Sequence, residues 1–455
     1  MSVNWQNLRL YDNVLDPMTP EWWAEEALLR FEKNLVASQL FNRDYEDRFQ
    51  EAGDVVNVHS VSDFETKRKT PGENISLQDA VSLGQQVKLN QHLYTAFSVE
   101  DREIQLGFPN LIEKFLEPAV QAIAEDLDFY CLLEQYNWVH NSGGRLGESA
   151  TYNALVDTST KMHNNKAPRE GRFMVVGPES EGDLLKTDKL TEFRMTGQQP
   201  SDPILNGIIA RGAGFWILQS QNVPTIPQQA DTSEATVDGN QPAGTKTLVV
   251  NALTSYNEIK EGQWILVAGD DTPQQVTDDA DETDTDIKIT PGLKRPVSND
   301  AVVTIFDHGT VNHGAGYDAG YDGEIITSGF TQMPHRGQGV TFGDSTKVYG
   351  IWSVSGNNIT LSQPLEADVS NGTHVNPLPW GTYNMAMRSP AATLVNRPMP
   401  LPRGGAVGGA IATNNNLSLR VIMSYDHLAM KTIVSIDSLF GLKTLLPNQG
   451  AVLLA

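Results

Sequence analysis

The sequence predicts an α+β fold that is interrupted by a segment of β structure alone. Apolar residues recur at helical spacing near residues 20–35 and 109–138, whereas the stretches 54–61, 86–99 and 417–446 have the composition and alternation of strands. Near residue 225 the composition changes, and no helical pattern returns before residue 380. At about 100 to 200 residues per domain, a chain of 455 residues predicts two to four structural units.

The first predicted helix carries an apolar stripe. Thr19 is suited to cap this helix and Pro20 to occupy its first position. Trp23, Ala27 and Phe31 then repeat at four-residue spacing, which places them on one face. An arm and a helix ahead of any sheet cannot build a core of their own. We therefore expect Trp23 and Phe31 to contact a partner surface.

The strand patterns 54–61 and 86–99 predict a long hairpin with a basic tip formed by Lys67, Arg68 and Lys69. An isolated two-stranded hairpin is marginally stable in water, so we expect something outside it to cover it. On a chain of net charge −23, three adjacent cations favour docking against an acidic patch of another subunit. The alternative is a solvated tip whose charge prevents aggregation.

The longest predicted helix opens at Pro109 and runs to about Trp138, although Pro118 is also suited to a first helical turn. About 30 residues at 1.5 Å each would span roughly 45 Å. A strand at 173–176, a Gly-Pro turn and a short helix at 182–190 follow, and the stretch 204–219 ends in another apolar strand.

The β segment, residues 226–380, contains a weak internal repeat. The stretch 286–303 (DIKITPGLKRPVSNDAVV) aligns without gaps to 358–375 (NITLSQPLEADVSNGTHV), and EGQWILVAGD from Glu261 resembles RGQGVTFGD from Arg336. We interpret this segment as two related β units of sandwich or barrel form. After it, Leu417–Asp426 and Lys431–Leu446 predict a terminal hairpin, and residues 381–455 are expected to complete the interrupted α+β domain.

Charge and cysteine content restrict the functional class. A net charge of −23 and a pI near 4.7 argue against specific nucleic-acid binding. The single cysteine, Cys131, excludes an intramolecular disulfide, and its helical context predicts a buried core residue. The first residues lack a basic region followed by an apolar run, and no stretch of 18 apolar residues occurs, so we expect neither a signal peptide nor a membrane span.

Candidate catalytic or metal-binding residues are few. His308 and His313 share a glycine-rich stretch (DHGTVNHGAGYDAGYDG), but a closed zinc site needs more ligands, so a flexible surface loop is expected. The run Asp278–Asp286 could attract calcium, yet it lacks the glycine and distal glutamate of an EF-hand, which favours a solvated acidic loop. We predict no catalytic residues, no metal, no cofactor and no enzymatic activity.

Several segments together resemble one known family. These are ALLRFEKNLVASQLFNRDYEDRFQEAGDVVNV near the N-terminus, LNGIIARGAGFWILQSQNVPT before the β segment, MAMRSPAATLVNRPMPLPRGGA after it, and SLRVIMSYDHLAMKTIVSIDSLFGLKTLLP near the C-terminus. They resemble tailed-phage major capsid (coat) proteins with the Hong Kong 97-type fold. The branch of the short-tailed Salmonella phage coat protein, which carries an inserted surface domain, is the most similar. The order of the segments and the place of the insertion carry this resemblance.

The resemblance implies a capsid fold with five parts. Residues 1–50 would form the N-terminal arm and helix, 51–100 the extended β-hairpin loop, and 101–225 the long spine helix with the first part of the peripheral and axial domains. Residues 226–380 would form the inserted all-β domain, and 381–455 would complete the axial and peripheral domains.

The same resemblance implies the function and the partners. The chain would assemble with itself, as hexamers and pentamers, into the icosahedral shell of a virion in the host cytoplasm. A scaffolding protein and a portal would assist assembly, and a decoration protein is a further candidate partner. Packaged double-stranded DNA would be contacted non-specifically. Lys67, Arg68, Lys69, Trp23 and Phe31 are the candidates for contacts between subunits. Two alternatives stay open, namely a modular β-rich surface-binding or adhesion protein and an encapsulin-type compartment subunit.

Overall fold

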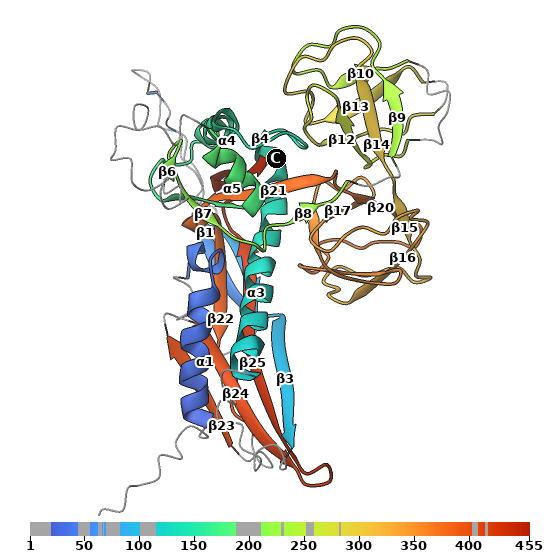
Figure 1. Ribbon diagram of the computed structural model, residues 1–455. Coiled ribbons are helices and arrows are strands. Elements are labelled where there is room, and N and C mark those ends of the chain that lie inside the picture. The colour runs from blue at the N-terminus through green and yellow to red at the C-terminus, as the bar shows by residue number, and fades with distance from the viewer. Residues whose placement is uncertain are drawn as a thin grey trace, which may run out of the picture. The chain divides into compact units, whose positions relative to one another are not determined.

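The computed structural model describes residues 20–43, 55–61, 66, 68–69, 82–100, 115–187, 211–228, 232–251, 259–281, 284–402, 408–414 and 417–455. Within these residues the chain is a strand-rich α+β protein, as expected (Figure 1). It divides into two compact units that are each discontinuous in sequence. Unit 1 comprises Met1–Ser38, Asn42–Leu127 and Thr393–Leu445, and unit 2 comprises Gln39–Phe41, Asp128–Ala392 and Leu446–Ala455.

Unit 1 is built on an antiparallel sheet. Its strands are β3 (Gln91–Glu100), β22 (Ala392–Arg397), β23 (Gly408–Asn414), β24 (Leu417–Asp426) and β25 (Lys431–Thr444). The order is β22-β25-β24-β23, and β3 also pairs with β25. The predicted terminal hairpin is confirmed, because β24 and β25 pair from Arg420 opposite Asp437 to Asp426 opposite Lys431.

The N-terminal helix lies against this sheet. Helix α1 (Pro20–Asn34) begins at the predicted proline and packs on β23 and β24 (Figure 1). Its apolar stripe is buried there, including Ala27 and Phe31, which have no exposed surface. The partner surface that the stripe requires is thus supplied by the C-terminal part of the same chain. A short 3₁₀ turn, η3 (Ser38–Leu40), follows the helix.

The predicted hairpin is split into two structures. Strand β1 (Val55–Val61) pairs antiparallel with β2 (Ser82–Lys88), and these two strands form a sheet of their own. The second predicted strand does not continue to residue 99 in that sheet. After Leu89 and Asn90 the chain enters β3, which pairs along its full length with β25 instead. The sequence Leu89-Asn90 contains no glycine or proline that would mark this break.

The α-helical part of the long helix ends at Leu133, ahead of the predicted end near Trp138. Helix α3 (Glu117–Leu133) has Pro118 in its first turn, where the missing N–H of proline is tolerated. The chain then narrows into a 3₁₀ helix, η6 (Glu134–Asn141), whose residues Tyr136 and Trp138 are fully buried. The predicted opening at Pro109 lies outside the described residues.

Unit 2 contains a mixed sheet with helices α4 (Tyr152–Asn164) and α5 (Pro178–Leu185). Its strands are β4 (Ser142–Gly144), β5 (Arg172–Val176), β6 (Arg211–Gly212), β7 (Phe215–Gln219), β8 (Thr225–Ile226), β21 (Gly381–Arg388) and β26 (Gly450–Leu454), and two 3₁₀ turns are η7 (Ser389–Ala391) and η8 (Pro447–Gln449). The order is β4-β26-β21-β5-β7-β6, with β8 also on β21. Helix α4 covers a core that includes Leu155, Met174 and Leu453.

The β segment forms two six-stranded modules. Module A consists of β9 (Thr232–Thr236), β10 (Thr247–Val249), β11 (Trp264–Val267), β12 (Gln274–Val276), β13 (Asp286–Thr290) and β14 (Val302–Phe306). Module B consists of β15 (Gly309–Val311), β16 (Glu324–Ser328), β17 (Gly339–Phe342), β18 (Tyr349–Ser355), β19 (Asn358–Leu361) and β20 (His374–Pro377). Each module has its own apolar core.

The two modules have the same topology, which confirms two related β units. Module A runs β10-β13-β12-β11-β14-β9, and module B runs β16-β19-β18-β17-β20-β15, so the first to sixth strands take identical places. Module B closes into a barrel through β15 and β16. In module A the equivalent edges meet through an isolated bridge between Val237 and Val250, just beyond β9 and β10.

Matching turns show that the duplication extends to single hydrogen bonds. Gly262 and Gly337 have φ of 90° and 88°, the left-handed conformation that a turn of this type requires of its third residue. The next residues, Gln263 and Gln338, are buried. The side-chain Oε1 of each accepts a hydrogen bond from the backbone N–H three residues earlier, at 2.7 Å for Gln263 and 2.9 Å for Gln338. Each Nε2 then donates to a carbonyl near the end of the last strand of its module.

Replacing Gln338 by Ala is expected to loosen module B. The substitution leaves a buried N–H and a buried carbonyl without partners, at a cost of roughly 1 to 3 kcal/mol. Gln263→Ala should do the same to module A. Hydrogen exchange resolved by peptide is the measurement, and faster exchange should be confined to β17 and β20 in the first variant. The exposed Gln221→Ala serves as control, and equal exchange in all variants would contradict the assigned role.

Candidate functional site

The sequence-predicted contact residues fall into three groups in the structure. Arg68 and Lys69 are exposed, whereas Lys67 and the side chain of Trp23 lie outside the described part of the chain. Phe31 is fully buried beneath its own sheet, so a contact between Phe31 and another subunit would require α1 to leave β23 and β24. The expectation that another subunit is needed to cover Phe31 is therefore wrong, because β23 and β24 of the same chain cover it. Docking by the basic tip stays a prediction.

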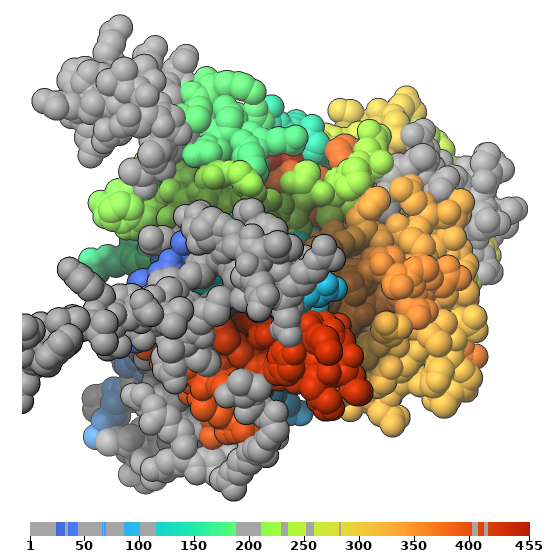
Figure 2. All heavy atoms as spheres, turned by 60° about the horizontal axis from the view of Figure 1, so that its bottom comes forward, coloured from blue at the N-terminus to red at the C-terminus, as the bar shows by residue number. Residues whose placement is uncertain are grey.

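A second candidate surface is the turn between β24 and β25, which the sequence analysis missed. Leu428 is 87% exposed and Met430 66%, with Tyr425 beside them at 43%. The carboxylate of Asp426 accepts bonds from the backbone N–H groups of Leu428 and Ala429, and these bonds lower the pKa of Asp426. Figure 2 shows orange-red residues of this part of the chain on the surface that faces the viewer. The available signal was a leucine and a methionine in a turn where polar residues are usual.

The strands behind this turn are held by an ion pair. Arg420 of β24 donates through Nε and Nη2 to the two carboxylate oxygens of Asp437 at 3.0 and 2.5 Å, directly opposite on β25. Asp437 is 5% exposed, and His92 of β3 approaches the same carboxylate at 3.5 Å. A two-pronged arginine–carboxylate contact fixes direction as well as distance. The exposed turn therefore projects from a firmly aligned base.

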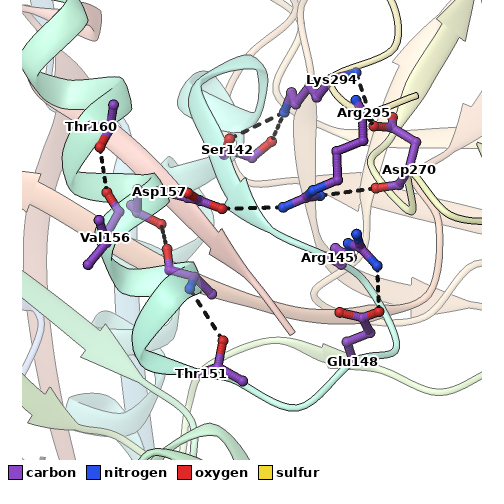
Figure 3. Close-up of polar contacts among 12 residues, drawn as sticks. Ser142, Arg145, Glu148, Thr151, Val156, Asp157, Thr160, Asp270, Lys294 and Arg295 are labelled. Atoms are coloured by element: carbon purple, nitrogen blue, oxygen red, sulfur yellow. Dashed lines mark hydrogen bonds and ion pairs between the residues drawn. The ribbon is translucent and has the colours of Figure 1, made fainter. Parts of the chain in front are cut away.

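Module A is anchored to the sheet of unit 2 by polar contacts (Figure 3). Lys294 donates through Nζ to Oγ and to the carbonyl of Ser142 at 2.7 and 3.3 Å, and Arg295 lies 3.3 Å from the carboxylate of Asp157 on α4. The buried carboxylate of Asp270 accepts bonds from the backbone N–H groups of Lys294 and Arg295 at 3.0 and 2.8 Å. It thereby directs Lys294 towards strand β4 and Arg295 towards helix α4.

Module B is anchored through aromatic packing on the end of α3 and on η6. The hydroxyl of Tyr136 donates to the carbonyl of Gly337, and the ring meets the backbone of Gly339 so closely that a side chain there would clash. The Arg336 guanidinium lies over the rings of Phe129 and Trp352, at 4.4 and 5.1 Å from their centres. The cation–π contact with Phe129 and the hydrogen bond from Tyr136 thus join this module to α3 and η6, whereas Trp352 belongs to the module itself.

The two histidines of the glycine-rich stretch contact different side chains. His308 lies edge-on to His374 with ring centres 4.7 Å apart, whereas His313 stacks on Tyr317. Burial, and then the neighbouring His374, lower the pKa of His308, and its Nδ1 faces the side-chain amide of Gln263 at 2.6 Å. Within the described ranges, no group of three or more His, Cys, Asp or Glu side chains could hold a metal ion.

Three other expectations can be compared with the structure. The stretch GYDAGYDG is not simply a flexible loop, because Tyr317 is 7% exposed in the core of module B and its hydroxyl accepts a bond from the N–H of Ile326. The acidic run pairs with lysines, since Asp278 and Asp279 contact Lys288 and Lys260. Cys131 is buried, as predicted.

Comparison with solved structures finds phage proteins at low identity. A structure of Mycobacterium phage Che8 shares 14% identity with a TM-score of 0.46, covering 92% of this chain and 90% of that chain. The capsid structure of Cyanophage P-SCSP1u shares 10% at a TM-score of 0.43, covering 89% and 84%. The capsid of Ralstonia phage GP4 shares 7% at 0.41, covering 93% and 89%. No protein-family model and no curated protein sequence matches the chain. Because these TM-scores are below 0.5, the function is argued below from the chain's own residues.

In the part of the chain that the structure describes, no helix has both the length and the apolar character that a membrane crossing requires.

The anchor of module A should strengthen as the pH rises from 8 to 10. Burial, and then the neighbouring Lys161 cation, lower the pKa of Lys294 from 10.5 to about 8. Below pH 8 the charged amine must be desolvated on folding, which costs up to a few kcal/mol of stability. This cost decreases as the pH rises from the folded pKa of about 8 to the unfolded value of 10.5. Thermal unfolding at pH 7.5, 9 and 10 measures this rise.

Lys294→Met should remove the rise, whereas Lys246→Met, at an exposed position of the same module, should leave it unchanged. A rise of the same size in the Lys294→Met variant would contradict this assignment.

Proposed function

We propose that this chain is the major capsid protein of a tailed bacteriophage, a subunit that assembles with itself into an icosahedral shell around double-stranded DNA. The observation that carries the proposal is the two-stranded sheet of β1 and β2, which pairs with no third strand among the described residues. A sheet of two strands is marginally stable in water unless another surface covers it. A neighbouring subunit in a shell would supply that surface at every repeat.

One end of this sheet is fixed to the rest of unit 1. Val87 and Leu89, at the end of β2, are buried in a small cluster with Val395 and Leu445. The backbone of Lys88 also lies so close to Gly441 that a Cβ there would meet its carbonyl oxygen. An extension with a firm base and no third strand suits a segment that lies over a neighbour.

The placing of the β modules supports the same proposal. Strand β8 precedes them and β21 follows them, and these two strands pair with each other, so the modules are an insertion into an otherwise continuous sheet. The segments that resemble phage coat proteins lie on both sides of this insertion and in the order expected of that family. The exposed Leu428 and Met430 offer a further apolar surface for contacts between copies.

Under this proposal each part takes a role from the Hong Kong 97-type fold. Residues 51–100 are the extended loop, α3 is the spine helix, and 226–380 are the surface insertion. The chain forms hexamers and pentamers with the help of a scaffolding protein and a portal, and a decoration protein is a further partner. A net charge of −23 keeps the wall from adhering to packaged DNA.

The alternative of a surface-binding protein draws on the duplicated modules. Tandem copies of one module are usual in binding proteins, but here both modules are fixed to residues of the same unit, through Ser142, Asp157 and Tyr136. An encapsulin-type subunit would share the core fold but would not account for the insertion.

Purified full-length chain should form closed shells, rings or capsomers. Sedimentation velocity and negative-stain electron microscopy, with and without co-expressed scaffold, are the measurements. A monomer that persists at high concentration under both conditions would exclude the shell proposal and favour a binding protein. Shells formed without any scaffold or portal gene beside the chain's own gene would favour the encapsulin alternative.

Reversing the charge of the basic tip, as Lys67→Glu, Arg68→Glu and Lys69→Glu together, should raise the concentration needed for assembly about tenfold. Three exposed ion pairs at roughly 0.5 kcal/mol each correspond to that factor. Light scattering against protein concentration measures it. Lys166→Glu, Lys186→Glu and Lys246→Glu together form a charge-matched control at exposed positions. Equal assembly of the two triple variants would refute docking by the tip.

A further inference from the structure

Four arginines gather at one end of the sheet of unit 2. The register places Arg388 of β21 directly opposite Arg172 of β5. On the other side of β5, strand β7 carries Trp216, which pairs with Arg211 of β6. Arg169 precedes Arg172 in the loop that leads into β5. The topology thus concentrates four positive charges on three strands of one sheet and one loop, in a chain with 56 acidic and 33 basic residues.

Within the part of the chain that the structure describes, these arginines are bonded to neutral groups only. Arg172 is 1% exposed and donates through Nη2 to the carbonyl of Ala167 at 2.6 Å and through Nε to that of Pro168 at 2.8 Å. Arg388 donates to the carbonyl of Glu170 and to the side-chain oxygen of Gln449.

The other two arginines follow the same pattern. Arg169 donates to Nε2 of His163, and Arg211 lies over the ring of Trp216. Among the described residues, no carboxylate forms an ion pair with any of the four.

This arrangement is unfavourable for an isolated chain. Like charges directly opposite on neighbouring strands destabilise a sheet, and a charge removed from water without a counter-ion costs more than a paired one. Burial, and then the nearby Arg169 and Arg388, lower the pKa of Arg172, which reflects the same repulsion. The hydrogen bonds to carbonyls position the guanidinium but do not neutralise it. The missing component is an anion.

The structure leaves space for that anion. A hollow of about 430 Å³ has a lining that includes Arg169, Arg172, Arg211 and Trp216 together with one acidic residue, Glu170, and an adjoining hollow of about 360 Å³ shares Arg169 and Arg172. Trp216 is 43% exposed at the rim, with the guanidinium of Arg211 at 3.6 Å from its ring centre. Exposed tryptophan and arginine are the residues that dominate binding energy at protein interfaces.

We propose that this arginine cluster receives a carboxylate-bearing segment of a second copy of the chain, an inference that rests on the self-assembly proposed above. Charge complementarity selects this occupant. Each copy carries a net charge of −23 and presents many carboxylates, and arginine binds a carboxylate through two parallel hydrogen bonds. A nucleic acid would have to approach a surface that repels its phosphates. Copies that repel each other overall are thus drawn together at one defined place.

Charge reversal at the exposed members provides the first test. Arg169→Glu and Arg211→Glu, each alone, should raise the concentration needed for assembly by about tenfold or more, because each leaves a carboxylate facing a carboxylate. Lys246→Glu, an equal change of charge at an exposed position of module A, should have little effect. Light scattering and sedimentation measure all three variants. If both arginine variants assemble like the wild type, the proposal is overturned.

A cross-linking experiment tests the contact in chains that keep their charge. Arg169→Lys and Arg211→Lys place an amine in the cluster, and a carbodiimide joins an amine to a carboxylate that touches it. In assemblies mixed from ¹⁴N and ¹⁵N copies, mass spectrometry should find the introduced amine joined to an aspartate or glutamate of the other isotope. Links only within one copy would overturn the proposal, as would variant shells that form normally but hold less nucleic acid.

These outcomes separate the inference from the shell proposal. Shells that form in the wild type and in the lysine variants, with no link between copies in those variants, retain the shell and reject the cluster contact. Lysine variants that carry the link in small oligomers, with no shell formed even by the wild type, retain the cluster contact and reject the shell. A wild-type chain that stays monomeric, with lysine variants that form no link, rejects both.

Discussion

Strand β21 joins distant parts of the chain through backbone hydrogen bonds, because β26 pairs along one of its edges while β5 and β8 pair along the other. The side chain of Asn384 adds to them, because its Oδ1 accepts from the N–H of Gly177 and its Nδ2 donates to Ser180 and to the carbonyl of Leu453. Asn384 has no exposed surface, so these bonds form away from water, where an unpaired amide is costly. Because β8 and β21 pair, the two ends of the inserted segment lie side by side, and the sheet can form whatever segment lies between them.

The modules illustrate what such an insertion requires. Each pairs all six of its strands within itself, so no strand edge has to be matched by the sheet that it interrupts. The hydrogen bonds of Gln263 and Gln338 repeat in the two copies, whereas the contacts with the rest of unit 2 do not. Lys294 and Arg295 use ionic and polar contacts in module A, and Arg336 uses aromatic rings in module B. The two modules therefore share the way in which their strands pair, but each contacts the rest of unit 2 through residues of its own.

Charge is unevenly used in this chain. Acidic residues exceed basic ones by 23, yet the arginine cluster at β5, β6 and β21 has no ion-paired carboxylate among the described residues. A general repulsion between copies combined with local attraction favours contacts that are weak, specific and repeated, which suits the ordered growth of a closed shell. The exposed Leu428 and Met430 would add apolar area at another place. Assembly would then depend on a few well-positioned contacts between copies rather than on a general attraction between them.

The sequence by itself determined the elements whose signals are local. These include the start of α1 at Pro20, the hairpin of β24 and β25, and the duplication of the β segment, because periodicity, proline and repeated letters act over a few residues. Only the tertiary structure decided where β3 pairs, what covers Phe31, and that Arg172 lies opposite Arg388. These depend on residues hundreds of positions apart, and alternation fixes which face of a strand is apolar but not which strand lies beside it.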